Sequence, residues 1–344
     1  DGRRAPGRRP TMKDVAALAG VSLSTVSRVV NGADVDATLA RQVQDAARLL
    51  GYRRDHAAST LRRADRQTSS VGLIYEDVSN PLFSSMHRGV EEIARSRGVL
   101  IFAASSDDDP AAEHALAQGF SERGVDGLIV VPAGDDHSYL ARERDAGTAL
   151  VFVDRPPKLL EADTVLTDNA DGVRRAVARM IDLGHRRIGY LGDRQRIFTA
   201  AERHRGYSEA LAAAGIAEDP ALVRLDLADS DIAQAATREL LTSAEPPTAL
   251  LAGQNLITIG AVHALRELGR QHRVALVAFD DLTLADAVEP GLTVVAQDPI
   301  ALGRRTAELL FSRIDGYDGP PRREIVPTTL IARGSGEIGP VDAA

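Results

Sequence analysis

Arg28 lies among small hydroxyl residues near the start of the chain, and this combination of residue types suits contact with nucleic acid. An arginine makes two parallel hydrogen bonds to a guanine edge in the major groove, whereas serine and threonine hydroxyls bond phosphates. Ser22 and Thr25 are the phosphate candidates. The residues expected to face outward are Leu23, Ser24, Ser27 and Arg28.

Three short helices are predicted to position these residues. Thr11 begins the first helix as its N-cap, and Gly20 ends it. Ser22 caps a second helix, 23–30, in which Val26 and Val30 are expected to face the core. A tight turn between two short helices is typical of a helix-turn-helix unit.

The third helix is predicted over residues 37–50, with Asp36 as its cap and Gly51 as its end. Its apolar residues recur with helical spacing. They are Leu39, Val43, Ala46, Ala47 and Leu50. A small helical bundle used for protein contacts is the alternative interpretation of the whole segment.

Charge favours the nucleic-acid interpretation. Residues 1–66 hold 13 Arg or Lys and 7 Asp or Glu, a net charge of +6, although the whole chain has a net charge of −8. The remaining residues therefore have a net charge of −14. A basic segment on an acidic body is typical of a polyanion-binding module, although an unevenly charged solvated surface gives the same composition.

Residues 11–32 read TMKDVAALAGVSLSTVSRVVNG, which resembles the signature of the lac repressor (LacI/GalR) family of transcription regulators. The resemblance implies that Leu23, Ser24 and Arg28 read bases and that Thr11 and Asn31 belong to the same DNA contact. Members of the family differ at the positions of Leu23 and Ser24. The operator preference of a relative therefore does not transfer to this chain.

Residues 52–63 resemble the hinge helix of the family, which becomes ordered on operator DNA. The resemblance implies that Leu61 enters the minor groove at the dimer axis, where an apolar wedge unstacks a base step. Arg62 and Arg63 are suited to neutralise flanking phosphates. A plain linker that happens to contain a leucine is the alternative.

From residue 71 onward, short apolar runs alternate with amphipathic segments, which predicts parallel α/β units. The first set of predicted strands is 71–75, 99–103, 128–131 and 149–153. The second set is 188–191, 222–225, 249–252, 274–279 and 293–296. We predict two doubly wound parallel sheets with a cleft where the carboxyl ends of their strands meet.

Strings similar to the family continue over residues 11–331, and the body also resembles two-lobed periplasmic sugar-binding proteins. The fold class is therefore an all-α helix-turn-helix domain and hinge helix, followed by an α/β two-lobed core. The predicted divisions are a basic flexible arm at 1–10, a DNA-binding domain at 11–55, a hinge helix and linker at 56–70, and an effector-binding and dimerisation core at 71–344. Within the core we assign 71–168 and 297–326 to lobe 1, and 169–296 and 327–333 to lobe 2. The resemblance places the lobe crossings near Asp168, Ala296 and Val326.

The resemblance also supplies candidate contacts for an effector in the cleft. They are Phe83, Asp154, Thr199, Arg203, Gln254 and Asp280. Carboxylate and guanidinium groups pair with vicinal hydroxyls, and an aromatic ring covers an apolar face, which suits a sugar. Phe83 as plain core packing and a structural pair of Arg203 with Asp280 are the alternatives.

Two departures from the family pattern concern the ligand. The family usually has Asn-Asp where this chain has Gln254-Asn255, and Ala278 replaces a usual glycine. Because the first departure changes a polar group of the expected pocket, the identity of the ligand cannot be carried over.

Other functional classes receive little support from the sequence. The chain has no cysteine, so disulfides and thiolate metal sites are excluded, and none of the usual catalytic signatures is present. Asp154 with Asp280 is the only candidate pair for a sugar-modifying enzyme. Residues 107–109 suggest either a cation site or a loop that caps a helix. A solute-binding protein for transport is the second rival, although residues 1–10 do not resemble an export signal.

We therefore predict a cytoplasmic, homodimeric repressor that binds a near-palindromic double-stranded operator and responds to a small polar effector. We expect neither catalysis nor a cofactor, a metal ion or membrane association.

Overall fold

The computed structural model of the chain describes residues 10–30, 33–52 and 68–340. The chain separates into two units, which divide between Thr68 and Ser69. Each unit has its own hydrophobic core. We call the first unit the head and the second unit the body.

Within residues 10–30 and 33–52 the head has three helices, as predicted: α1 (Met12–Ala19), α2 (Leu23–Val30) and α3 (Ala37–Leu50). The Thr11 and Asp14 side chains form a reciprocal capping box at the start of α1. Gly20 ends this helix with φ +67°, in the left-handed region that glycine adopts without strain. Asp36 caps α3 by accepting hydrogen bonds from two backbone N–H groups.

Side chains from all three helices form the core of the head. The buried members are Val15, Ala16, Val26, Val43 and Ala46. Val30 is half-buried against them, as expected, whereas Leu39 of the apolar stripe of α3 is 37% exposed and does not belong to this core.

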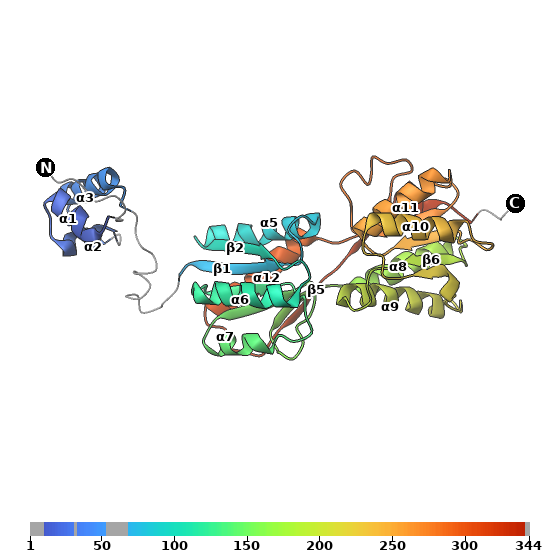
Figure 1. Cartoon of the computed structure of the whole chain (residues 1–344), viewed down its shortest axis with the longest axis horizontal. Helices are drawn as coiled ribbons and strands as arrows, with labels where there is room; N and C mark the ends of the chain where they lie inside the picture. The colour runs from blue at the N-terminus through green and yellow to red at the C-terminus, as the bar shows by residue number, and fades with distance from the viewer. Residues whose placement is uncertain (1–9, 31–32, 53–67, 341–344) are drawn as a thin grey trace. The chain divides into compact units, whose positions relative to one another are not determined.

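The body contains two six-stranded sheets, each flanked by helices on both faces (Figure 1). The sheet of lobe 1 has the order β11-β5-β4-β3-β1-β2, and all its strands are parallel. Its strands are β1 (Ser70–Tyr75), β2 (Leu100–Ser105), β3 (Gly127–Val130), β4 (Ala149–Val153), β5 (Asp163–Thr167) and β11 (Arg323–Val326). Its helices are α5 (Pro81–Ser96), α6 (Pro110–Glu122), η1 (Ser138–Leu140), α7 (Ala141–Asp145) and α12 (Pro299–Ile314).

The sheet of lobe 2 has the order β12-β10-β9-β8-β6-β7, and β12 is antiparallel to β10. Its strands are β6 (Ile188–Leu191), β7 (Val223–Arg224), β8 (Ala249–Ala252), β9 (Ala275–Phe279), β10 (Thr293–Ala296) and β12 (Thr329–Ile331). Its helices are α8 (Asn169–Asp182), α9 (Phe198–Ala213), η2 (Pro220–Leu222), α10 (Ser230–Leu241), α11 (Asn255–Glu267) and η3 (Gly334–Glu337).

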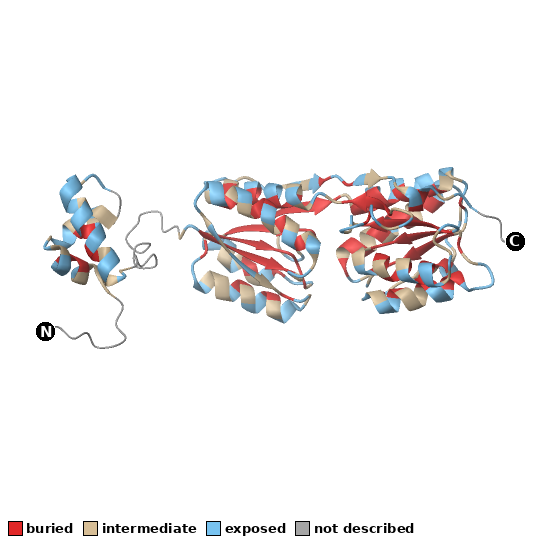
Figure 2. Cartoon of the chain, turned by 90° about the horizontal axis from the view of Figure 1, so that it is seen from above, coloured by how far each residue is buried: buried red, intermediate tan, exposed pale blue. Residues whose placement is uncertain are grey.

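Alternate residues of the central strands pack against different helices. In β1, for example, Leu73 belongs to the core under α5 and α12, and Ile74 belongs to the core under α6. Because successive strand residues point to opposite faces, a strand covered on both faces is apolar throughout. Figure 2 shows this pattern as buried strands between helices that are exposed on their outer sides. The predicted fold of two doubly wound lobes is therefore confirmed.

The nine predicted strands are all present, most within one or two residues of the predicted bounds. The main difference is 222–225, where only Val223–Arg224 is extended and Leu222 belongs to η2. Strands β5, β11 and β12 were not predicted from the sequence. The chain passes from one sheet to the other after Thr167, Ala296 and Val326.

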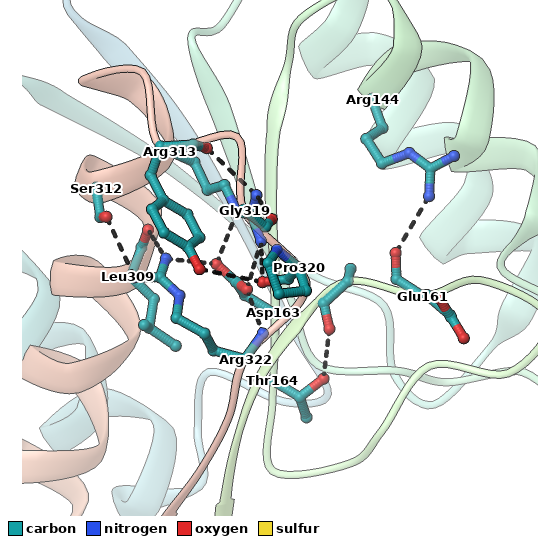
Figure 3. A network of polar contacts seen from close by, with 12 residues as sticks. Arg144, Glu161, Asp163, Thr164, Leu309, Ser312, Arg313, Gly319, Pro320 and Arg322 are labelled. Atoms are coloured by element: carbon teal, nitrogen blue, oxygen red, sulfur yellow. Dashed lines mark hydrogen bonds and ion pairs between the residues drawn. The ribbon is translucent and has the colours of Figure 1, made fainter.

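A buried carboxylate holds the amino end of β5 in lobe 1 (Figure 3). Asp163 is fully buried and accepts hydrogen bonds of 2.7–2.9 Å from the guanidinium groups of Arg313 and Arg322 and from the Arg322 backbone. Both guanidinium groups also lie over the Tyr317 ring, at 4.7 and 4.1 Å from its centroid. These contacts attach the loop between α12 and β11 to the end of the sheet remote from the cleft.

Candidate functional site

The first candidate surface lies on α2 in the head. Leu23, Ser24 and Arg28 are exposed, whereas Val26 is fully buried against α1 and α3. This arrangement confirms the predicted inward and outward directions of these side chains. Ser27 is half-buried, so it faces outward less completely than expected.

Hydrogen bonds organise the polar side chains at the start of α2. Ser22 Oγ accepts from the Thr25 backbone N–H at 3.1 Å and lies 2.8 Å from Thr25 Oγ1. It also lies 2.7 Å from Ser24 Oγ. Arg28 Nη2 donates to the Asp34 carbonyl oxygen at 2.6 Å, which orients the guanidinium beside the helix.

The structure gives no direct support to the other predicted DNA contacts. The Thr11 hydroxyl donates to Asp14 at 2.8 Å within the capping box of α1, so it already has a structural role. Asn31, Leu61 and Arg62 lie outside the described residues. Their roles stay predictions.

The second candidate site is a cavity of about 260 Å³ between the lobes of the body. It lies at the carboxyl ends of the strands, where ligands bind in open α/β sheets. All six residues proposed as effector contacts line it, two from lobe 1 and four from lobe 2. They are Phe83, Asp154, Thr199, Arg203, Gln254 and Asp280.

Arg203 lines this cavity, and hydrogen bonds hold its side chain in place. It is buried, and its Nε and Nη1 atoms donate to Asn169 Oδ1 at 2.7 Å and to the Gly253 carbonyl at 2.8 Å. Its guanidinium lies 3.7 Å from the centre of the Phe279 ring. Asp280 instead accepts from Gln297 Nε2 at 2.7 Å, so each of the two residues has its own partners.

Asp154 and Asp280 occupy equivalent positions in the two lobes. Each follows the last residue of a strand, β4 or β9, and each has a positive φ, +68° and +75°. Their backbone N–H groups donate to Val165 and Val295 on the neighbouring strands, both at 3.0 Å. The strained backbone therefore presents one carboxyl from each lobe to the cavity. Burial raises the pKa of Asp154, although the charges of Arg155 and Arg203 oppose this effect.

Phe83 and Gln254 combine structural and lining roles. Phe83 is 2% exposed, and the centre of its ring lies 6.0 Å from the centre of the Tyr75 ring. Phe83 therefore packs in the core of lobe 1 and also lines the cavity. Gln254 caps α11 by accepting from the Leu256 N–H at 2.7 Å, and its amide donates to Asp193 at 3.3 Å. Gln254 therefore serves both as the N-cap of α11 and as a lining residue of the cavity.

An ionic network that was not predicted from the sequence lies beside the cavity. Arg155 binds Asp108 at 2.7 Å, forms an ion pair with Glu76, and lies 3.6 Å from Asp154. Burial raises the pKa of Glu76 to about 6, although the charge of Arg155 opposes this. In the sequence, the adjacent charged residues Asp154 and Arg155 directly after an apolar strand could have indicated this network.

Two contacts of this region cross from lobe 1 to lobe 2. Arg196 Nη2 donates to Asp108 Oδ2 at 2.6 Å, and Asn255 Nδ2 donates to Asn80 Oδ1 at 3.2 Å. Asp108 therefore belongs to an ion-pair network, while Asp109 caps α6 through the Ala111 N–H.

Further hydrogen bonds join the strands that cross between lobes. The Thr328 N–H donates to Asp168 Oδ1 at 2.6 Å, and Arg175 donates to both Asp168 and Thr328. Thr167 Oγ1 donates to Gln297 Oε1 at 2.7 Å. Since Gln297 also bonds Asp280, a hydrogen-bonded path runs from the cavity to the crossing strands.

The described residues show neither the arrangement of a metal site nor a membrane-spanning helix. Within 10–30, 33–52 and 68–340, no group of His, Asp and Glu side chains has the arrangement of a metal site. No helix in this part of the chain is long and apolar enough to cross a membrane. His185 is buried and bonded to Thr248 and the Ile338 carbonyl, which is a structural role.

Both units are similar to known proteins. Residues 11–55 match the family described as bacterial regulatory proteins, lacI family, and residues 177–336 match the periplasmic binding protein-like domain. The transcriptional regulator CelR of Thermobifida fusca is 36% identical over 340 residues, which are 96% of this chain and 99% of that protein.

Two solved structures extend these similarities. The transcriptional regulator CelR–cellobiose complex is 34% identical with a TM-score of 0.71, and the match covers 95% of this chain and 100% of that chain. The lac repressor dimer bound to operator and the anti-inducer ONPF is 25% identical with a TM-score of 0.85, over 96% of this chain and 99% of that chain. These relatives are transcriptional regulators and not enzymes.

Proposed function

Because this chain belongs to the LacI family of DNA-binding transcriptional repressors, we propose that it acts as a homodimer on a near-palindromic operator and that a sugar in the body cavity modulates its binding. The observation that supports the effector half of this proposal is the convergence of six side chains from both lobes on one cavity. We place this function in the cytoplasm, where bacterial DNA lies.

The side chains of α2 support its role as the DNA-recognition helix of the head. Arg28 is exposed and oriented by Asp34, and the start of the helix presents hydroxyl groups and no acidic residue in its first turn. The N-terminus of a helix has partial positive charge and attracts phosphate. We propose that residues 11–55 bind DNA, and that residues 56–70, with Leu61 and Arg62, form the hinge and linker.

The exposed edge of the lobe 1 sheet supports a homodimer. Strand β2 lies at this edge, and its Leu100 and Phe102 side chains are 68% and 42% exposed. An uncovered apolar edge strand promotes uncontrolled pairing, so proteins cover such edges or use them in defined interfaces. A second copy that covers β2 also supplies the second head that a twofold operator requires.

The chemistry of the cavity supports a polyol ligand. Asp154 and Asp280 offer hydrogen-bond acceptors from opposite lobes, and Phe83 contributes an aromatic face. The CelR structure that this chain resembles is a complex with cellobiose, which makes a β-linked glucose disaccharide the first candidate. A ligand that bonds both lobes favours one lobe arrangement over another and thereby changes operator affinity.

The test is selection of duplex DNA from a random pool by the full chain, followed by salt titration and addition of sugars. We expect a near-palindromic sequence, a steep loss of affinity with salt and a change of affinity with at least one sugar. Failure to enrich any sequence, with or without a sugar panel present, would contradict the proposed regulator. A transport protein or sugar-modifying enzyme would instead bind or convert the sugar and select no DNA.

A further inference from the structure

A second cavity lies in lobe 1, at the end of the sheet that is remote from the cavity between the lobes. Ala149 begins β4 and lines this second cavity, whereas Asp154, which follows β4, lines the cavity between the lobes. Asp163, which begins β5, and Pro321, two residues before β11, also line it. Its volume is about 480 Å³, within the range of about 300–1,000 Å³ that is typical of small-molecule sites. We call it the amino-end cavity.

The loop between α12 and β11 forms one wall of the amino-end cavity (Figure 3). Arg313 fixes this wall by donating from Nε and Nη2 to Asp163, both at 2.9 Å. Its Nη1 and Nη2 atoms donate further hydrogen bonds to the carbonyl groups of Tyr317, Gly319 and Pro320. All five N–H groups of this guanidinium are therefore engaged within the protein. Arg313 is a structural part of the wall and has no N–H group left for a ligand.

The charges of this wall balance one another. The Asp163 carboxylate pairs with Arg313 at 2.9 Å and with Arg322 at 2.7 Å. Asp318, which also lines the cavity, lies close enough to Arg313 for its charge to act on the guanidinium. Two guanidinium groups thus face two carboxylates, so the wall contributes no net charge to the cavity.

The other charged residues of the lining leave one negative charge unbalanced. Arg144 pairs with Asp145 at 3.0 Å and donates to the Glu161 backbone carbonyl at 3.2 Å. The Glu161 side chain is exposed, and among the described residues no hydrogen bond or ion pair reaches its carboxylate. The amino-end cavity therefore has an excess of negative charge, which attracts a cation and opposes an anion.

Apolar groups make up much of the remaining lining. They belong to Leu150, Ala162, Tyr317 and Pro321. Tyr317 is 37% exposed, although two guanidinium groups lie over its ring. An apolar group in the cavity would remove part of this surface from water, which favours binding.

We propose that the amino-end cavity is a second ligand site, which binds a small molecule with a protonated amine on an apolar body. The ammonium group pairs with Glu161, and the apolar body packs against Leu150 and Tyr317. A carboxylate or phosphate ligand is disfavoured, because Glu161 repels it and Arg313 has no N–H group to offer. This site is separate from the cavity between the lobes, and it takes a cation where the proposed effector is a neutral sugar.

The test is calorimetric titration of the full chain with 2-phenylethylamine, which joins an ammonium group to an aromatic ring. We expect a dissociation constant of about 1 mM or lower. The alcohol 2-phenylethanol keeps the apolar body without the charge and should bind more weakly. The anion 3-phenylpropionate reverses the charge and should bind at least about fivefold more weakly than the amine.

Glu161→Gln removes the charge and keeps the size of the side chain. It should weaken amine binding about fivefold, the upper end for an exposed ion pair, and make the amine and the alcohol bind alike. Because Glu161 is exposed, urea unfolding should not change. Glu143→Gln is the matched control, because Glu143 lies on α7 of the same lobe and does not line the cavity. It should bind the amine as the parent does.

Asp280→Ala distinguishes the two cavities, because Asp280 lines the cavity between the lobes. The amine should bind this variant as it binds the parent, and a loss of amine binding would overturn the proposal. No binding of the amine by the parent, equal binding of the amine and the carboxylate, or parent-like binding by Glu161→Gln would also overturn it. None of these outcomes depends on operator selection or sugar binding, so the second site and the proposed function can fail separately.

Discussion

The head and the body assemble their candidate sites in opposite ways. In the head, Leu23, Ser24, Thr25, Ser27 and Arg28 lie on one eight-residue helix, and Arg28 bonds Asp34, only six positions further along the chain. In the body, they come from both lobes and bond across long stretches of sequence, as Arg203 does with Asn169 and Gly253. Leu23, Ser24 and Arg28 of the head are exposed, whereas Asp154, Thr199 and Arg203 of the body are buried.

This difference indicates a division of energetic roles. An exposed residue such as Arg28 contributes mainly when DNA is present, so its removal should affect binding and not folding. A buried polar residue contributes to the folded state itself, because its removal leaves its partners unsatisfied in a low-dielectric interior. Substitutions in the two units should therefore separate into those that change DNA affinity and those that change stability or ligand affinity.

The largest effect is expected for Asp163→Ala. This change leaves Arg313 and Arg322 without their buried carboxylate, and breaking such a pair costs about 3–5 kcal/mol of unfolding free energy. Urea unfolding of the body measures the loss. A loss below about 1 kcal/mol would mean that buried networks do not dominate the stability of this unit.

The same carboxylate predicts an acid-sensitive contribution to stability. Burial alone would raise the pKa of Asp163, but hydrogen bonds from Arg313 and Arg322 outweigh it and hold the pKa below its ordinary value. The folded state therefore binds this proton less readily than the unfolded state. The contribution is present above the unfolded pKa, about 3.9, and is lost as pH falls through the lower folded value. The parent should lose this part of its stability on acidification, and Asp163→Ala should lack it.

Asp280→Ala should weaken ligand binding by about 1.5–3 kcal/mol, the range for a hydrogen bond to a charged group. Operator affinity without ligand should be unchanged, because the substitution lies in the body. Calorimetric titration with the effective sugar measures the first quantity. Asp281→Ala is the matched control, because that neighbour pairs with Arg333. Equal effects of the two substitutions would remove Asp280 from the ligand site.

Arg28→Ala should cost about 1–3 kcal/mol on the selected operator and relax the preference at one base position. Ligand affinity and urea unfolding should not change. Fluorescence anisotropy with operator variants measures the effect, and Arg48→Ala, an exposed arginine paired with Asp45 on α3, serves as the control. Parent-like binding by Arg28→Ala would show that the recognition surface lies elsewhere.

The smallest effect is expected for Arg196→Ala, which removes the ion pair to Asp108 across the lobes. Because the Arg196 side chain is 56% exposed, solvent screens this pair, and its loss should cost at most about 1 kcal/mol. Ligand should bind up to about fivefold more weakly at low salt, and the difference should diminish at high salt. A large effect that does not depend on salt would indicate a buried role for Arg196.

The same contrast explains how much could be predicted from the sequence. Caps and apolar spacing are local, so the helices of the head and most strands of the body were correctly predicted. The six cavity residues came from the family resemblance, and the structure brings them together. The network of Arg155 with Glu76 and Asp108 was missed, because its members are separated by tens of residues and depend on the tertiary fold. Strands β11 and β12 were missed because they lie at sheet edges and are only partly buried, so they lack the continuous apolar runs of the central strands.

The most direct test of the account is the thermodynamic coupling between the two units. Operator affinity of the full chain is measured at increasing sugar concentration, and sugar affinity is measured with and without saturating operator. We predict that the sugar changes operator affinity at least tenfold, about 1.4 kcal/mol, and that the operator changes sugar affinity by the same factor. Operator affinity that stays constant at saturating sugar would contradict the account.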